Sequence, residues 1–192
     1  MTSGFYTALV GLAAVTIGYV RHWSQGRKCK SSARLDGKTV VITGGNAGIG
    51  KETARELSKR GAKVIIGSRN LEKSKQTAQD IRIETGNEVI ALTLDLASFA
   101  SVRNFVQELF KHVEKIDILI NNAGIMWIPE EKTVDGNEKQ IQVNHLGHFL
   151  LTNLVLERLN KPSRIINLSS LAHNWSKSTL LFFDDLFCNG GN

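Results

Sequence analysis

The apolar residues of this chain follow two patterns, short continuous runs and stretches in which they recur at helical spacing. The short runs are rich in β-branched residues and are typical of buried strands; they lie at residues 38–43, 63–67, 88–94, 116–120 and 164–168. The stretches of helical pattern alternate with them, at residues 51–60, 70–84, 98–113 and 136–159. This alternation predicts an α/β fold, a doubly wound parallel sheet with helices on both faces.

A longer apolar run at the N-terminus predicts a membrane anchor. Residues 1–20 contain no Lys, Arg, Asp or Glu, and the segment from Gly4 to Val20 is almost wholly apolar. It is at the short end of what a helix needs to cross a hydrocarbon core of roughly 30 Å. A cleaved signal peptide is the alternative, but such a peptide carries its positive charge before the apolar core. We therefore expect an uncleaved anchor at residues 1–22, in the endoplasmic reticulum or the mitochondrial inner membrane.

The positive charge of the chain is concentrated directly after this run. The formal net charge is +6, and the stretch from Arg21 to Lys38 accounts for +5 of it, with Asp36 as its single acid. A nucleic-acid-binding face needs cations spread over the folded domain, so nucleic acid is excluded as a partner. We interpret residues 23–36 as a basic linker. The two cysteines, Cys29 and Cys188, belong to no metal-binding motif, and we expect free thiols and no metal site.

A glycine-rich turn joins the first predicted strand to the first predicted helix. Gly44, Gly48 and Gly50 lie between residues 38–43 and residues 51–60. Glycine lets the backbone turn sharply and approach a pyrophosphate, and the first amides of the helix then point at the anion. The order of strand, glycine turn and helix therefore predicts a dinucleotide-binding turn; a turn with no ligand is the alternative.

The end of the second predicted strand indicates which dinucleotide is bound. An NAD site places Asp or Glu there to accept from the ribose 2′-hydroxyl, whereas an arginine accommodates a 2′-phosphate. Residues 63–70 contain no acid, Arg69 follows the strand, and Ser68 offers a further donor. We expect NADP(H) as the cofactor. The alternative is that Arg69 is only an exposed residue at the start of a helix.

Several motifs in this order resemble the short-chain dehydrogenase/reductase family. They are Thr43-Gly44-x-x-x-Gly48-Ile49-Gly50, Asp95-Leu96 after the third strand and Asn121-Asn122-Ala123-Gly124 after the fourth. Residues 143–152 and 164–173 are similar to the retinol dehydrogenase branch of that family, and the similarity extends from about residue 35 to about residue 187. The resemblance implies a Rossmann-type domain, a retinoid-like or other lipophilic aldehyde or alcohol as substrate, and a homodimer formed through helix 136–159.

The resemblance also implies roles for individual residues. Ser170 would hydrogen-bond the substrate carbonyl, and Asn144 would support a water in the proton relay; their plainer roles are a turn and a helix cap or kink. Asp95 would accept from the adenine amino group and Arg69 would hold the 2′-phosphate. The complete set of residues expected to bind the cofactor is Gly44, Asn46, Gly48, Ile49, Gly50, Ser68, Arg69, Asp95, Leu96, Asn122, Ala123 and Gly124.

One motif of the family does not occur in these 192 residues. Proton transfer in the family depends on Tyr-x-x-x-Lys, but the two tyrosines here, Tyr6 and Tyr19, are followed four residues later by Val10 and Trp23. We therefore expect residues 37–192 to form an incomplete NADP-binding domain of about five strands, with the last strands missing and negligible turnover. The alternative function is a truncated, non-catalytic isoform that binds dinucleotide or pairs with full-length protomers.

Overall fold

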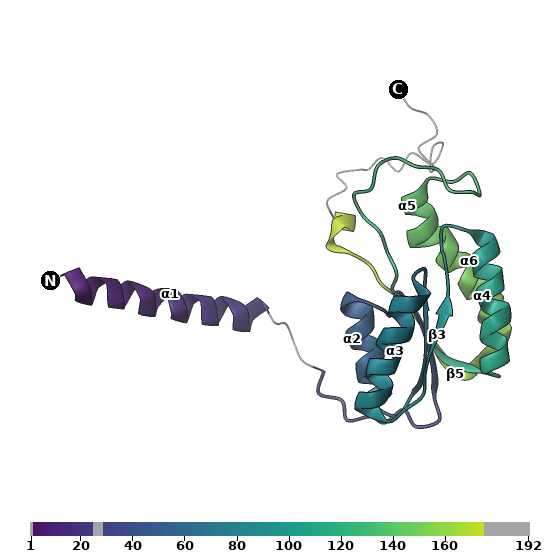
Figure 1. Ribbon diagram of the computed structural model, residues 1–192, viewed down its shortest axis with the longest axis horizontal. Helices are drawn as coiled ribbons and strands as arrows, with labels where there is room; N and C mark the ends of the chain where they lie inside the picture. The colour runs from purple at the N-terminus through teal and green to yellow at the C-terminus, as the bar shows by residue number, and fades with distance from the viewer. Residues whose placement is uncertain (1, 25–28, 175–192) are drawn as a thin grey trace. The chain divides into compact units, whose positions relative to one another are not determined.

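The computed structural model describes residues 2–24 and 29–174 (Figure 1). The chain divides into two compact units, Met1–Ala33 and Arg34–Asn192. Cys188 and the tail residues 182–187 lie outside the described residues. Cys29 is exposed, and among the described residues no group of three His, Cys, Asp or Glu side chains is arranged to hold a metal ion.

The N-terminal unit carries helix α1 (Thr2–Ser24), which has no acid in its first turn and Arg21 and His22 in its last turn. Apolar side chains are exposed along it, including Val10, Val15 and Ile17. Within the described part of the chain, no helix combines the length and the apolarity needed to cross a membrane. The expected N-terminal helix is therefore present, and its insertion into a membrane stays a prediction.

The second unit is built on a sheet of five parallel strands, as the sequence pattern predicts. The strands are β1 (Thr39–Thr43), β2 (Lys63–Ser68), β3 (Val89–Thr93), β4 (Ile116–Asn121) and β5 (Leu159–Asn167). Their order in the sheet is β3-β2-β1-β4-β5. The chain builds outward from β1 to β3 and then returns to the other side of β1. Between β1 and β4 the direction of winding reverses, and ligands of doubly wound sheets bind at the carboxyl ends of the strands at such a point.

Helices cover both faces of this sheet. Helices α2 (Gly48–Lys59) and α3 (Leu71–Thr85) lie on one face, and α4 (Phe99–His112) and α6 (Gly147–Val155) lie on the other (Figure 1). Successive side chains of β1 point to opposite faces: Val40 and Ile42 belong to the core with α2 and α3, and Val41 belongs to the core with α4 and α6. Alternation along a strand buried on both faces accounts for its continuous apolar run.

The predicted long helix differs from the observed one in its start and in its middle. It begins with α5 (Lys139–Ile141), continues as the π-helical turn η1 (Gln142–Leu146) and α6, and ends with the 3₁₀ turn η2 (Leu156–Arg158). Gly136 has a positive φ of 83° and its amide donates to Thr133, so the backbone there forms a turn. The carboxylate of Glu138 then accepts from the amides of Gln140 and Ile141, which starts the helix three residues later than expected.

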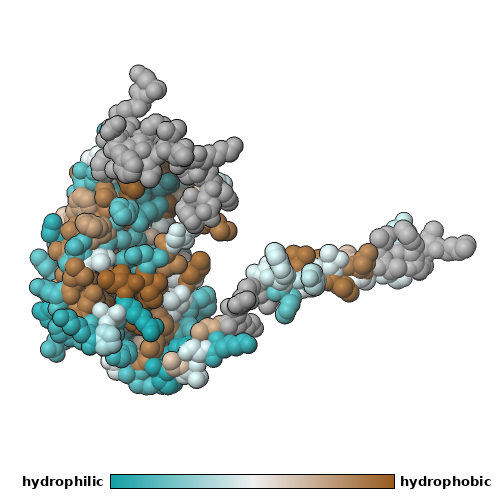
Figure 2. All heavy atoms as spheres, turned by 180° about the vertical axis from the view of Figure 1, so that it is seen from behind, coloured by the Kyte–Doolittle hydropathy of each residue, from teal (hydrophilic) through white to brown (hydrophobic). Residues whose placement is uncertain are grey.

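Strand β5 is at the edge of the sheet and is longer than the predicted strand at residues 164–168. It pairs first through Leu159 with Ile116, and the register shifts before Arg164 pairs with Ile118. Ile165 and Ile166 are 39% and 42% exposed, so the edge carries accessible apolar side chains. Figure 2, which views the molecule from behind, shows hydrophobic residues gathered in one area of this unit.

Candidate functional site

A cleft of about 460 Å³ opens at the carboxyl ends of the strands. All twelve residues expected to bind the cofactor line it, although they come from four separate stretches of the chain: Gly44, Asn46, Gly48, Ile49, Gly50, Ser68, Arg69, Asp95, Leu96, Asn122, Ala123 and Gly124. Six residues that the sequence did not single out complete the lining: Ala47, Gly67, Asn70, Leu94, Ile125 and Val143. Parallel strands end at one edge of the sheet, which is why these loops meet.

Two glycines bring the first turn close to its surroundings. Gly44 has φ of +67°, and a Cβ placed on it would lie 3.0 Å from the Cα of Ala123. A Cβ on Gly50 would lie 2.4 Å from the carbonyl oxygen of Gly44, so no other residue fits there without movement of the backbone. Gly48, by contrast, has φ of +52° and faces open space. The turn is therefore tightly packed at its two ends and open in its middle, where it lines the cleft.

The N-terminus of α2 has the properties of an anion site. Its N-cap is Ala47, whose side chain makes no capping hydrogen bond, and its first turn contains no acidic residue. The amides of a first helical turn carry partial positive charge and lack partners within the helix. Because Ala47, Gly48 and Ile49 line the cleft, these amides are placed to bind a phosphate there. The local structure thus fits a dinucleotide without any conflicting charge.

The other end of the cleft carries the features expected for the adenosine half. Arg69 is exposed, and its guanidinium takes part in none of the salt bridges among the described residues. Asp95 accepts from the amide of Ala97 through Oδ1 at 2.9 Å, and its other oxygen, Oδ2, makes no hydrogen bond to described residues. The hydroxyl of Ser68 contacts Ser74 and the Asn70 carbonyl, so it is already engaged at the start of α3.

The second turn of the site is joined to the first through Thr43. The Thr43 hydroxyl accepts from the amides of Asn122 and Ala123, each at 2.9 Å. The side-chain amide of Asn122 donates to the carbonyl of Thr43 at 2.8 Å. These bonds connect residues about 80 positions apart along the chain. They hold the loop after β4 against the end of β1, which defines one wall of the cleft.

A buried histidine continues this connection. His148 of α6 is 6% exposed; its Nε2 lies 2.8 Å from the Thr43 hydroxyl, and its Nδ1 lies 3.2 Å from the carbonyl oxygen of Asn144. Burial lowers the pKa of His148, and the nearby His145 lowers it further, against the hydrogen bond to Asn144. Neither Thr43 nor His148 is among the residues that the sequence predicts to bind the cofactor or to act in catalysis. The sequence offers one signal for His148: it lies four residues after Asn144, which places both side chains on the same face of a helix.

The two residues expected to be catalytic lie outside the lining of this cleft. Asn144 occupies the π-helical turn and holds Ile125, accepting from its amide at 2.8 Å and donating to its carbonyl at 2.9 Å. It also lines a neighbouring cavity of about 280 Å³, together with His148. Ser170 follows β5 and is exposed, and its hydroxyl accepts from the amide of Ala172 at 3.2 Å. π-helical turns are frequent at functional sites, and the expected roles of both residues stay predictions.

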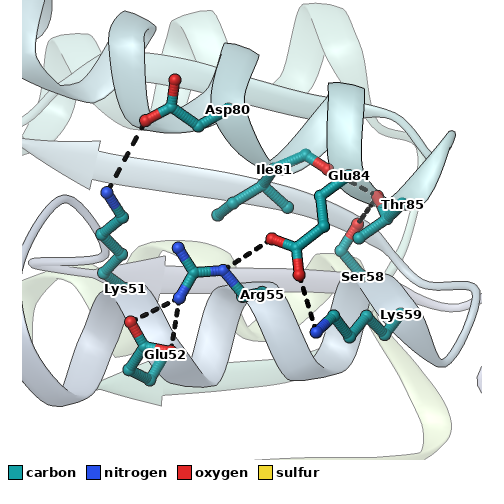
Figure 3. A network of polar contacts seen from close by, with 9 residues as sticks. All are labelled: Lys51, Glu52, Arg55, Ser58, Lys59, Asp80, Ile81, Glu84 and Thr85. Atoms are coloured by element: carbon teal, nitrogen blue, oxygen red, sulfur yellow. Dashed lines mark hydrogen bonds and ion pairs between the residues drawn. The ribbon is translucent and has the colours of Figure 1, made fainter.

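Ion pairs between α2 and α3 support the helix that carries the anion site (Figure 3). Glu84 of α3 forms ion pairs with Arg55 at 2.9 Å and with Lys59 at 2.7 Å, and Lys51 lies 3.7 Å from Asp80. The hydrogen bond from Lys59 lowers the pKa of Glu84, with Arg55 acting in the same direction and burial opposing it. Because several charges share the network, it orients α2 more firmly than isolated surface pairs do.

Comparison with known proteins gives a consistent result. The profile described as short chain dehydrogenase matches residues 38–179. Human retinol dehydrogenase 13 is 50% identical over 180 residues, which cover 92% of this chain and 54% of that protein. The chain spans about half the length of the curated relatives it matches.

Two solved structures extend the likeness to three dimensions. The RhlG/NADP active-site complex of Pseudomonas aeruginosa is 35% identical with a TM-score of 0.64, covering 72% of this chain and 57% of that one. A blue fluorescent protein from a metagenomic library, in complex with NADPH, is 27% identical with a TM-score of 0.66, covering 76% and 60%.

Proposed function

Because the chain belongs to the short-chain dehydrogenase family, we propose that its cleft binds NADP(H) and serves an oxidoreductase that acts on lipophilic alcohols and aldehydes. One observation carries the proposal: the cleft is lined by an uncapped helix N-terminus without acidic residues and by Arg69, which forms no salt bridge with any other described residue. The first suits the pyrophosphate and the second suits a 2′-phosphate. Complexes with NADP and NADPH among the structural relatives support the same cofactor.

Each part of the cleft has a task in this proposal. Gly48 and the amides of α2 bind the pyrophosphate, Arg69 binds the 2′-phosphate, and Asp95 accepts from the adenine amino group through its available Oδ2. Asn122, held by Thr43, orients the nicotinamide half. When bound, NADP(H) supplies or accepts a hydride. The 50% sequence identity to human retinol dehydrogenase 13 supports a retinoid-like substrate for the whole protein.

We further propose that residues 1–192 bind the cofactor without turnover. The family's tyrosine and lysine do not occur as Tyr-x-x-x-Lys in this sequence, so no acid–base pair is present to move the substrate proton. The test is titration of the purified 192-residue chain with NADPH, followed by fluorescence, and an assay of NADPH oxidation with retinal. Saturable binding without oxidation is expected. Failure to bind NADPH would overturn the cofactor proposal, and oxidation would overturn the proposed inactivity.

Membrane attachment through α1 is part of the same proposal. Apolar side chains are exposed along the helix, and positive charge follows in its last turn. Cationic residues beside an apolar segment favour the cytosolic side of a membrane. The test compares the full chain with a variant lacking residues 1–22 after alkaline extraction of membranes. Retention of only the full chain is expected, and equal release of both proteins would contradict the proposal.

Pairing with a second copy is the other candidate function, and exposed apolar residues favour it. Phe149 of α6 and Leu156 of η2 are 63% and 49% exposed on the helix that the family resemblance assigns to a dimer interface. Sedimentation velocity of the full chain in detergent decides the question. A dimer that becomes monomeric in the variant Phe149→Ser is expected, whereas a wild-type monomer at micromolar concentration excludes this candidate.

A further inference from the structure

We propose that His148 is a positioning residue for the cofactor cleft: as a neutral imidazole it directs the Thr43 hydroxyl toward the turn Asn122–Ala123, and it releases that turn when protonated. The inference rests on the proposed binding of NADP(H) in the cleft. His148 itself does not line the cleft, so it acts through Thr43 and through Asn144.

The hydrogen-bond geometry assigns the tautomer of His148. A hydroxyl donates one hydrogen bond and accepts two. The Thr43 hydroxyl accepts from the amides of Asn122 and Ala123, which occupies both of its lone pairs. Its one proton therefore points to Nε2 of His148, 2.8 Å away, and Nε2 must be the acceptor. Nδ1 then carries the hydrogen and donates to the carbonyl of Asn144 at 3.2 Å.

The surroundings of His148 favour its neutral form. Its side chain is buried, and Thr43 is fully buried. The neighbouring cavity that His148 lines is also lined by Asn121, Thr152 and Asn167, which carry no charge. Among the described residues that line this cavity, His145 of the same helix is the other titratable group, and it opposes a positive charge on His148. None of these residues has a carboxylate that could stabilise a positively charged imidazolium, so protonation of His148 is unfavourable.

Protonation of Nε2 creates a conflict at Thr43. The hydroxyl would then face three donors, the two backbone amides and the imidazolium, with two lone pairs to share among them. One amide of the Asn122–Ala123 turn must lose its partner, and both residues line the cleft. On the other side of the ring, His148 contacts the carbonyl of Asn144, whose side chain holds Ile125, also in the lining. Both ends of the turn are thus coupled to one imidazole.

The sign of the pH dependence follows from this conflict. The arrangement that holds the turn requires neutral His148, and burial lowers the pKa of His148 below the ordinary histidine value of about 6.5. Dinucleotide binding is therefore expected to be strong at neutral pH and to weaken as the pH falls through that lowered pKa. Loss of one buried hydrogen bond in the turn corresponds to roughly a tenfold decrease in affinity.

The first experiment needs no cofactor. A long-range ¹H–¹⁵N spectrum of the full chain in detergent at pH 7.5 reports the tautomer of each histidine, with His148 assigned from the variant His148→Gln or, if that variant does not fold, from sequential assignment. The Nδ1–H tautomer is expected for His148, together with a change in the amide resonances of Asn122 and Ala123 as His148 titrates. An Nε2–H tautomer, or amides that do not respond, would overturn the inference.

The second experiment measures NADP⁺ affinity by calorimetry between pH 5 and pH 7.5. His148→Gln keeps a side-chain oxygen as acceptor for Thr43 but does not titrate, so it should bind like the wild type at pH 7.5. Once the pH has fallen through the lowered pKa of His148, the variant should bind roughly tenfold more tightly than the wild type. The comparison of two proteins with one ligand cancels the titration of the 2′-phosphate. The matched control His145→Gln should still lose affinity at low pH, with the loss displaced to higher pH because His145 no longer opposes a charge on His148. Identical profiles for wild type and His148→Gln would contradict the inference.

The two proposals fail in different ways. If the wild type binds no NADP⁺ at any pH, the proposed function is overturned, and the amide resonances of the Asn122–Ala123 turn still decide whether His148 controls it. The other outcome is that the wild type binds NADP⁺ and its affinity changes with pH in the same way as the affinity of His148→Gln. The cofactor assignment then stands, and the role of His148 is rejected.

Discussion

The side chain of Asn144 bonds both backbone groups of Ile125. Oδ1 of Asn144 accepts from the Ile125 amide at 2.8 Å, and Nδ2 of Asn144 donates to the Ile125 carbonyl at 2.9 Å. The two residues are 19 positions apart: Asn144 lies in the π-helical turn, and Ile125 lies in the lining of the cleft, directly after Gly124. The Asn144 side chain therefore bonds both the amide and the carbonyl of Ile125, as the backbone of a neighbouring strand would. This arrangement makes the π-helical turn a support for the cleft.

Removing this side chain should loosen the cleft more than it destabilises the fold. For Asn144→Ala we expect NADPH affinity to fall roughly tenfold, because two hydrogen bonds to Ile125 are lost. The loss in free energy of unfolding should be about 1 kcal/mol, because Asn144 is exposed. Fluorescence titration and urea denaturation measure the two quantities. Asn153→Ala, which removes another exposed side-chain bond to the backbone of α6, is the control and should leave NADPH affinity unchanged.

Arg69 should decide between the two dinucleotides. In Arg69→Ala we expect NADPH affinity to fall roughly tenfold to a hundredfold, because hydrogen bonds between a guanidinium and a phosphate are charge-assisted. NADH affinity should change little, since NADH has no 2′-phosphate. Parallel titrations with both cofactors measure the ratio. Arg103, an exposed arginine of α4 outside the cleft lining, provides the control Arg103→Ala. An equal loss for NADPH and NADH would show that Arg69 has no role in recognising the phosphate.

The glycine turn and the loop after β4 should differ in their tolerance of an added methyl group. Gly50→Ala places a Cβ 2.4 Å from the Gly44 carbonyl oxygen, so we expect a destabilisation of about 1–3 kcal/mol and loss of NADPH binding. In Gly124→Ala the nearest atom, Oδ1 of Asn144, lies at 3.4 Å, and the fold should be retained. Thermal unfolding followed by circular dichroism compares the two variants. Equal stability of both would mean that the turn is not as tightly packed as the distances indicate.

Asp117 should make the stability of the domain sensitive to acid. Burial raises the pKa of Asp117, but hydrogen bonds from the Thr39 amide, Asn160 and Lys38 outweigh it, so the pKa lies below its usual range. A lowered pKa in the folded state contributes stability above the unfolded-state value of about 3.9, and this stability is lost as the pH falls through the folded-state value.

The variant Asp117→Asn tests this contribution. Its free energy of unfolding should be about 1–3 kcal/mol lower than that of the wild type at pH 7. This difference in free energy of unfolding should become smaller below about pH 4. Urea denaturation at several pH values measures this difference. Asp36→Asn is the control, because Asp36 is exposed and pairs with exposed Arg34. A difference that stays constant down to pH 2 would exclude a role for ionisation.

The sequence by itself determined the alternation of strands and helices, and it predicted the chemistry of the first turn. Residues 39–43 and 63–68 are strands because their β-branched apolar runs suit a surface that is buried on both faces. Gly44, Gly48 and Gly50 predicted the phosphate turn because their permissive backbone is a local property. Arg69 predicted a 2′-phosphate site from its place directly after a strand. These features depend on residues that are close in the sequence, and therefore a single chain reveals them.

Only the tertiary structure decided how these parts meet. Thr43 contacts Asn122 and His148, which lie 79 and 105 positions away, because β4 pairs with β1 and α6 packs on the same sheet. The π-helical turn at Asn144, the later start of the helix at Lys139 and the longer β5 also depend on such partners. A hydrogen bond between distant residues leaves no periodic signal in the chain. The contacts from which we infer the tautomer of His148 therefore exist only in the folded chain, where Thr43 and Asn144 lie beside the imidazole.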